Sequence, residues 1–167
     1  YVTEAVERGL LNGLGKNRFG PSKTMTRAMV VTVLHRLAGS PESTAEHPFT
    51  DVPEGQWYAE AVAWAYEEQI ANGVSEDRFG VNEAISRQQL VTMLYRFAQI
   101  AQIDTNGRAD LGSFADTPAI SSYASEPFQW AVAMEIINGD DGCLLPNNSA
   151  TRAQCAKIMV LFSDLMP

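Results

Sequence analysis

Three arginines occupy the same position in a recurring motif and could bind an anion. Arg27, Arg87 and Arg152 each follow a Thr or Ser that is suited to cap a helix. A cation in the first turn is mildly unfavourable, because the helix N-terminus is itself positive. A guanidinium beside free backbone N–H groups can, however, bind an anionic group. The recurrence therefore indicates either a ligand-binding role or an ion pair with an acidic residue, for which Asp51 and Asp116 are the candidates.

Few other side chains are placed for catalysis. The chain has no Gly-x-Ser-x-Gly elbow, no phosphate-binding loop and no Ser-His-Asp order. Cys143 and Cys155 lack the further ligands of a zinc site, and the sequence leaves open whether they form a disulfide. The segment 138–142 resembles a calcium loop but lacks the alternating ligands and the closing Glu. We therefore expect a protein that is not an enzyme and holds no metal and no cofactor.

Composition indicates a globular protein with an acidic surface. The 167 residues are 46% hydrophobic and 19% charged, which is not a disordered composition. Twelve Lys and Arg against twenty Asp and Glu give a net charge of −8, which repels nucleic acid and anionic membranes. There is no run of 18 apolar residues, the length that a transmembrane helix requires. We therefore expect no nucleic acid partner and no membrane insertion.

The arginines belong to a segment that occurs three times. Each copy has Asn-Gly, then Phe or Leu, and seven residues later the Thr or Ser that precedes the arginine. The copies are Asn12-Gly13 with Phe19 and Thr26, Asn72-Gly73 with Phe79 and Ser86, and Asn138-Gly139 with Leu144 and Thr151. Phe79 follows Phe19 by 60 residues, and Leu144 follows Phe79 by 65. Three copies at one internal spacing predict a protein built from repeats.

An upstream half is present in only two of the copies. Phe49-Thr50-Asp51-Val52 matches Phe114-Ala115-Asp116, and the same alignment places Trp57 over Tyr123. The first copy lacks this half, because Tyr1 already aligns with the helix of the second copy. We expect the chain to start inside a helix and a longer native protein to continue before Tyr1.

Each copy predicts a helix that begins after the Thr or Ser, whose hydroxyl can accept a hydrogen bond from an exposed N–H. Gln89 and Gln154 complete capping boxes in the second and third copies, whereas Met29 cannot do so in the first. Apolar residues recur four, seven, eight and eleven residues after each cap, which predicts one buried face. They are Val30, Val33, Leu34 and Leu37; Leu90, Met93, Leu94 and Phe97; and Cys155, Ile158, Met159 and Phe162.

An earlier helix is predicted in each unit, upstream of Asn-Gly. It covers residues 58–70 and 126–137, with Trp64 and Trp130 as core residues, and is expected to stop at Asn-Gly. A unit of about 55 residues with two short helices buries little surface on its own. We therefore predict an all-α fold in which three helix-loop-helix units pack around a shared axis. Units 1, 2 and 3 are residues 1–40, 48–101 and 113–167.

The repeated residues resemble the S-layer homology (SLH) family. Its pattern is Phe-x-Asp-Val, Trp, an Ala-rich helix, Asn-Gly, Phe-x-Pro and then Thr-Arg-Ala-Glu. Unit 2 carries it at 49–52, Trp57, 79–81 and 86–89; unit 3 at 114–116, Tyr123, 144–146 and 151–154; and unit 1 only at 19–21 and 26–29. The resemblance covers nearly the whole chain, and three copies in phase make it specific.

The resemblance implies a pseudo-threefold helical assembly without catalytic activity. It implies an extracellular, monomeric module that tethers a larger secreted or S-layer protein to the bacterial cell wall. The implied partner is secondary cell-wall polysaccharide, often with a pyruvylated amino sugar, bound in grooves between adjacent repeats. The alternative is a structural module for protein docking or self-assembly that binds no glycan.

The resemblance also implies how the grooves are composed. Each would combine the arginine region of one repeat with the Phe-x-Asp and Trp region of another. We expect Arg27 with Asp51 and Trp57 in one groove, and Arg87 with the unit 3 residues Asp116 and Tyr123 in the next. Arg152 should lack a partner, because unit 1 has no upstream half.

The residues themselves leave several roles open. Asp51 and Asp116 could bind sugar hydroxyls or cap a turn, and Trp57 could stack on a sugar or fill the core. The glycines of the Asn-Gly pairs, such as Gly13 and Gly73, could be helix stops or places where a ligand approaches bare backbone.

Overall fold

The computed structural model describes residues 1–16 and 18–167, which contain six α-helices and one 3-10 turn. They are α1 (Val2–Glu7), α2 (Arg27–Leu37), α3 (Ala59–Glu67), α4 (Arg87–Ile100), η1 (Thr117–Ala119), α5 (Ser122–Ala133) and α6 (Arg152–Ser163). These residues form isolated backbone bridges but no strand, and the predicted all-α class is confirmed. No helix in the described part is long and apolar enough to span a membrane.

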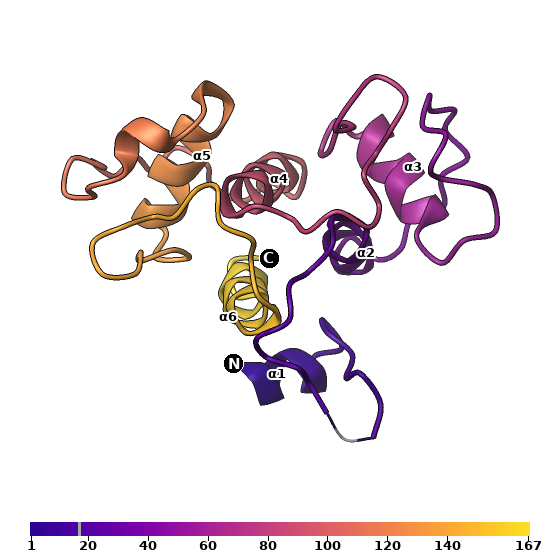
Figure 1. Cartoon of the computed structure of the whole chain (residues 1–167), viewed down its shortest axis with the longest axis horizontal. Coiled ribbons are helices and arrows are strands. Elements are labelled where there is room, and N and C mark those ends of the chain that lie inside the picture. Colours follow the sequence, from indigo (N-terminus) through magenta and orange to yellow (C-terminus); the bar gives the residue numbers. More distant parts are fainter. Residues whose placement is uncertain (17) are drawn as a thin grey trace.

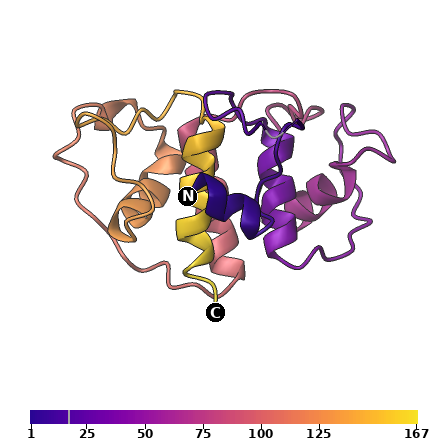
Figure 2. The same cartoon turned by 90° about the horizontal axis from the view of Figure 1, so that it is seen from below.

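The helices are arranged as a centre and a periphery. Helices α2, α4 and α6 occupy the centre, and α1, α3 and α5 lie outside them (Figure 1). Each outer helix packs on one central helix: α3 on α2, α5 on α4, and α1 on α6. The outer helix of a unit therefore contacts the central helix of the preceding unit, and the start of the chain packs on its end. The loops that lead into the central helices lie together at one end of the molecule (Figure 2).

Backbone hydrogen bonds join the three units in a closed ring just before the central helices. The N–H of Met25 donates to the carbonyl of Ala150 (3.0 Å), Ala150 donates to Ile85 (2.9 Å), and Ile85 donates to Met25 (2.9 Å). All three residues are buried. Each unit gives one bond and accepts one, so opening the ring would leave buried polar groups unpaired.

A second set of bonds joins the same units in the opposite direction at the first residue of each central helix. The N–H groups of Arg27, Arg87 and Arg152 donate to carbonyls of units 2, 3 and 1, at 2.9, 2.9 and 2.7 Å. The acceptors are Glu83, Asn148 and Lys23. The hydroxyls of Thr26, Ser86 and Thr151 accept a bond inside each helix, and the capping boxes form only in α4 and α6, as predicted. The start of every central helix is thereby fixed against a neighbouring unit.

One hydrophobic core runs through all three units. The predicted apolar faces of the central helices are buried, except that Leu37 at the end of α2 is half-buried. Trp64 and Trp130 are buried as predicted, and Phe97 stacks on Phe162 of unit 3 with ring centroids 5.7 Å apart. Each unit thus contributes its buried face to a shared core.

The prediction that the outer helices stop at Asn-Gly was wrong. Helices α3 and α5 end at Glu67 and Ala133, and the residues that reverse the chain are Gln69 and Glu135, both at φ 57°. The N–H of Ile70 bonds to the carbonyl of Ala65, and Gln69 bonds to Tyr66, which is the pattern of a Schellman motif. In unit 1 the same position is Gly9, at φ 69°.

Packing requires a glycine in the Asn-Gly pairs of units 2 and 3. A Cβ at Gly73 would lie 2.6 Å from the ring of Phe49 and 2.4 Å from two backbone carbonyls. At Gly139 the same atom would lie 2.7 Å from the ring of Phe114. The aromatic residue of the upstream half therefore excludes any side chain at this position.

We predict that the units unfold together. Leu94 is fully buried in α4, so Leu94→Ala should lower the free energy of unfolding by about 2–5 kcal/mol. Because the core is shared, chemical denaturation of both proteins should give one transition by circular dichroism and by tryptophan fluorescence. Two separate transitions in the unchanged chain would contradict the shared core.

The left-handed helix ends give a matched pair of variants. A side chain in the left-handed region costs about 1–2 kcal/mol, so Gly9→Ala should destabilise the protein by about 1 kcal/mol. A Cβ at Gly9 meets no atom within 4 Å, so the loss would report backbone conformation alone. Gln69→Gly should stabilise by about 0.5–1 kcal/mol, because relief of strain exceeds the added flexibility of the unfolded chain. Denaturant titration measures both, and equal stability of all three proteins would refute the assigned helix ends.

Candidate binding grooves between the units

Three grooves lie where the units meet, and they are built from the same parts. Each contains the first-turn arginine of one unit, the Asn-Gly segment of the next unit and one face of that unit's central helix. We name them the Arg27, Arg152 and Arg87 grooves, and their volumes are about 500, 230 and 210 Å³.

An exposed aromatic residue from the remaining unit completes two of the grooves. Tyr123, 48% exposed, lines the Arg27 groove, and Trp57, 61% exposed, lines the Arg152 groove. The lining of the Arg87 groove includes no aromatic residue among the described ones, and the ring centroid of Tyr1 lies 6.0 Å from the Nζ of its lining residue Lys157. The expected aromatic partners were therefore wrong: Arg27 lies with Tyr123 instead of Trp57, and Arg152, which was expected to have no partner, lies with Trp57.

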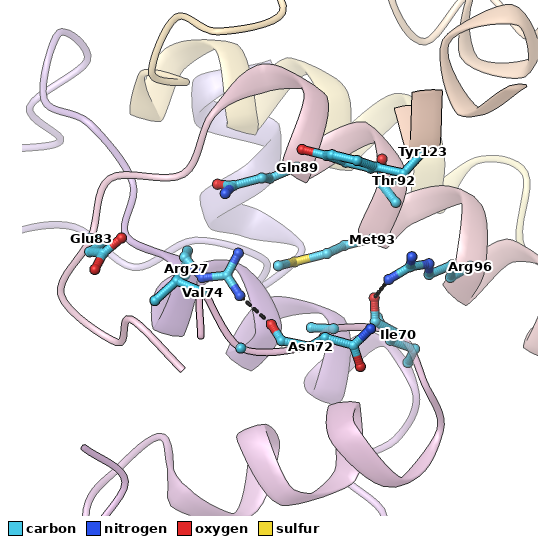
Figure 3. A pocket seen from close by; sticks show the side chains of 12 residues that line it. Arg27, Ile70, Asn72, Val74, Glu83, Gln89, Thr92, Met93, Arg96 and Tyr123 are labelled. Atoms are coloured by element: carbon cyan, nitrogen blue, oxygen red, sulfur yellow. Dashed lines mark hydrogen bonds between the residues drawn. The ribbon is translucent and has the colours of Figure 1, made fainter. Parts of the chain in front are cut away.

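The guanidinium of Arg27 is held by the main chain of unit 2. Its Nε donates to the carbonyl of Phe79 at 2.9 Å, and an Nη donates to the carbonyl of Asn72 at 2.5 Å. The group also lies over the Phe79 ring, 4.8 Å from the centroid. Figure 3 shows it facing the same opening as Met93, Arg96 and Tyr123. The arginine is therefore buried and fixed at one wall of the groove.

The other two arginines follow the same plan with one difference. Arg152 donates to Phe19 (2.8 Å) and Asn12 (2.5 Å) and lies 4.6 Å from the Phe19 ring centroid. Arg87 donates through Nε to Leu144 (2.8 Å), where the ring of the other two units is replaced by a leucine. Arg87 thus has fewer contacts that fix its guanidinium than Arg27 and Arg152 have.

No described carboxylate forms a direct ion pair with the three arginines. Within the described residues, the ion pairs join other side chains, and the expected pairs with Asp51 or Asp116 do not form. Burial lowers the pKa of Arg27, Arg87 and Arg152, but an arginine stays protonated in proteins. Each groove therefore has a fixed positive charge that is surrounded mainly by carbonyl dipoles.

Asp51 and Asp116 support the arginines indirectly. The carboxylate of Asp51 accepts the N–H groups of Phe79 (2.8 Å), Gly80 (2.8 Å) and Val81 (3.2 Å). Asp116 accepts those of Leu144 (2.8 Å) and the next residue (2.7 Å). Both aspartates thus hold the segment whose carbonyl receives the arginine, which agrees with the capping alternative. A direct contact of either aspartate with a sugar stays a prediction.

The structure also places the remaining candidates. The backbone N–H groups beside the arginines are not free, because they donate to the neighbouring unit. Gly13 and Gly73 line the Arg152 and Arg27 grooves. Cys143 and Cys155 are free thiols; burial, partly offset by the arginine charges, raises the pKa of Cys155 to about 12 and keeps its thiol neutral.

Sequence reasoning missed the second cation of each groove. Arg36 lines the Arg152 groove, Arg96 the Arg27 groove and Lys157 the Arg87 groove. A signal was present for two of them, since Arg36 and Arg96 both stand ten residues after their caps. The Arg152 groove has two cations and no acidic lining residue in the described part, whereas Glu83 and Asp140 line the other two.

Comparison with known proteins identifies the family. The S-layer homology domain model matches residues 1–28, 48–91 and 113–156, and the chain belongs to this family. It is 28% identical to an endoglucanase of Bacillus sp. (strain KSM-635) over 95% of the chain and 17% of that protein. It is 29% identical to the surface-layer 125 kDa protein of Lysinibacillus sphaericus over 94% of the chain and 13% of that protein.

The chain spans less than a fifth of the length of these relatives. The SLH module itself is non-catalytic, even where, as in the endoglucanase, the name of the relative is that of an enzyme. The module is of the kind that anchors proteins at the cell surface, and its location is extracellular, at the bacterial cell wall.

The Asp51 contacts predict an acid-sensitive stability. Desolvation acts to raise the pKa of Asp51, but the N–H donors of Phe79, Gly80 and Val81 together lower it below its ordinary value. A carboxylate whose pKa is lowered by folding stabilises the folded state at pH values above its unfolded pKa of about 3.9. This stabilisation is lost as the pH falls through the lower pKa of the folded state.

Asp51→Asn should therefore lower the free energy of unfolding by about 1–3 kcal/mol at pH 7, and the difference should shrink below about pH 4. Urea titrations across this range measure it. The exposed Asp141→Asn serves as control and should match the unchanged chain at each pH. A pH-independent loss in Asp51→Asn would rule out the carboxylate's role.

Proposed function

We propose that this module anchors a larger surface protein by binding a secondary cell-wall polysaccharide that carries acid groups, of the pyruvylated amino-sugar type, and that it does so as a monomer. The observation that carries the proposal is the buried guanidinium of Arg27 and of Arg152, which forms no ion pair within the described residues and lies beside an exposed aromatic ring. A desolvated cation without a counter-ion favours an anionic ligand. A carboxylate on a sugar ring would provide that charge.

The shape of the grooves supports a sugar rather than a free anion. An acid group at the arginine would gain a charge-assisted hydrogen bond. The adjacent ring, Tyr123 or Trp57, offers an apolar face with a polar edge, as amphipathic ligands require. Arg36 and Arg96 add a second positive group farther along the central helix of each groove. In each of these two grooves an aromatic ring accompanies two cations. A polysaccharide with acid groups at regular intervals could place an acid group at each cation and a sugar ring against the aromatic ring.

The composition of the three grooves ranks them. The Arg152 groove, with two cations, no acidic lining residue and the most exposed ring, should bind the acidic glycan most tightly. The Arg27 groove has Glu83 opposite its cations and should follow. The Arg87 groove has the smallest volume of the three and an acidic lining residue, Asp140, and should bind more weakly than the Arg152 groove.

Binding to purified wall sacculi tests the proposal. Trp57→Ala and Tyr123→Ala should each weaken binding about two- to tenfold, and Arg27→Ala about tenfold or more. Ile100→Ala serves as control, because this exposed side chain lies outside the groove linings.

Two treated wall preparations separate the alternatives. Removal of the polysaccharide should abolish binding, and removal of its acid groups alone should erase the effect of Arg27→Ala but leave that of Trp57→Ala. Undiminished binding to stripped sacculi, or self-association that the same variants weaken, would instead favour a module for protein docking or self-assembly.

A further inference from the structure

We propose that Gln88 is a positioning residue for the Arg27 groove. Its side-chain amide fixes the start of α5 and thereby holds the ring of Tyr123 ready for the ligand, a role at the glycan that rests on the proposed function. Gln88 lies in the first turn of α4, is only 6% exposed and does not line the groove itself. It therefore acts through Tyr123 and not by touching a sugar.

Both ends of the Gln88 amide are bonded to unit 3. The carbonyl oxygen accepts the backbone N–H of Ser121 at 3.0 Å, and the NH₂ group donates to the side-chain oxygen of Asn147 at 2.8 Å. The backbone N–H of Gln88 also donates to the carbonyl of Pro146 at 2.9 Å. A buried amide whose donor and acceptor are both satisfied keeps one orientation. Gln88 thus joins the central helix of unit 2 to two separate loops of unit 3.

Ser121 connects this amide to the groove. It is the N-cap residue of α5 and makes no side-chain cap bond of its own, so Gln88 holds the start of that helix from outside. Tyr123 follows two residues later, and its ring lines the Arg27 groove together with Gln89 and Thr92 of α4 (Figure 3). A tyrosine has only two side-chain torsions, so its backbone position largely sets where the ring lies.

The Arg152 groove is built without such an amide and provides a comparison inside the same molecule. The residue that corresponds to Gln88 is Ala28 in α2, which has no polar side-chain atom. The aromatic residue of that groove, Trp57, precedes α3, is 61% exposed and meets the edge of the Tyr58 ring with centroids 5.1 Å apart. The rings of the two grooves are therefore held in different ways.

The consequence for binding is preorganisation. A ligand that must order a mobile side chain loses affinity by about two- to tenfold for each such side chain, and a ring already held in place avoids that loss. Gln88 should therefore contribute to affinity at the Arg27 groove and contribute nothing at the Arg152 groove.

Two substitutions test the positioning without any ligand. Gln88→Met keeps the size of the side chain but removes both amide bonds. Gln88→Glu keeps an acceptor for Ser121, favourably placed at a helix N-terminus, and the exposed Asn147 can turn its own NH₂ group toward the second oxygen. Backbone ¹⁵N order parameters at residues 121–123 should fall in Gln88→Met and stay near those of the unchanged chain in Gln88→Glu. Unchanged order in Gln88→Met, or an equal loss in both variants, would overturn the proposal.

A binding titration then tests the role at the groove. The probe is an acidic oligosaccharide released from wall sacculi, followed by NMR at the Nε–H of Arg27 and at the indole N–H of Trp57. Gln88→Met should weaken binding about two- to tenfold at Arg27 and leave the affinity at Trp57 unchanged. In a Tyr123→Ala chain, the same substitution should have no further effect, because the ring through which it acts is gone.

The outcomes separate this proposal from the proposed function. Equal losses at both grooves, or a loss at Arg27 that persists in the Tyr123→Ala chain, would show general destabilisation and contradict a positioning role. If the unchanged chain binds the oligosaccharide at neither groove, the proposed function fails, and the order parameters still decide whether Gln88 holds Tyr123. Full affinity at Arg27 despite a disordered segment 121–123 would refute the contribution of Gln88 to binding.

Discussion

The ring of backbone hydrogen bonds through Met25, Ile85 and Ala150 is the constraint on which the rest of the molecule depends. It joins segments far apart in sequence, and each of its bonds is buried. The bonds from the first helical residues, such as that from Arg27 to Glu83, join the same units in the opposite direction and fix the start of each central helix beside a neighbouring unit. The arginine side chain belongs to that same residue. The closed arrangement of the three units therefore determines which loop the guanidinium contacts.

The arginines connect this scaffold to binding. Each gives up hydration to lie against carbonyls of the next unit, and no carboxylate in the described part pairs with it. Carbonyl dipoles and a ring face, as at Phe79 and Phe19, offset part of that cost, and an anionic ligand would offset more. The same groups therefore hold the units together and set the charge of the grooves. Asp51 contributes to the groove indirectly, because its carboxylate fixes the segment whose carbonyl accepts the hydrogen bond from Arg27.

The features that could be predicted from the sequence are those set by residues close to one another in the chain. The repeats, the all-α class, the capping boxes and the buried faces depend on residues a few positions apart, and they were predicted correctly. The partners within each groove depend on the cyclic order of the units, in which Trp57 reaches Arg152 across the junction of the two chain ends. No local pattern encodes that order. The left-handed residues Gln69 and Glu135 were missed because neither residue type signals a helix end.

The arginine side-chain Nε–H resonances in a two-dimensional NMR titration test the central claim most directly, since they report the groove charges themselves. On addition of an acidic oligosaccharide released from the wall, the resonances of Arg27 and Arg152 should shift and saturate together with the indole N–H of Trp57. Those of the exposed Arg18 and Arg78 should stay in place. Unchanged resonances for the buried arginines, or shifts spread over the exposed ones without saturation, would contradict the assignment of the grooves as the binding sites.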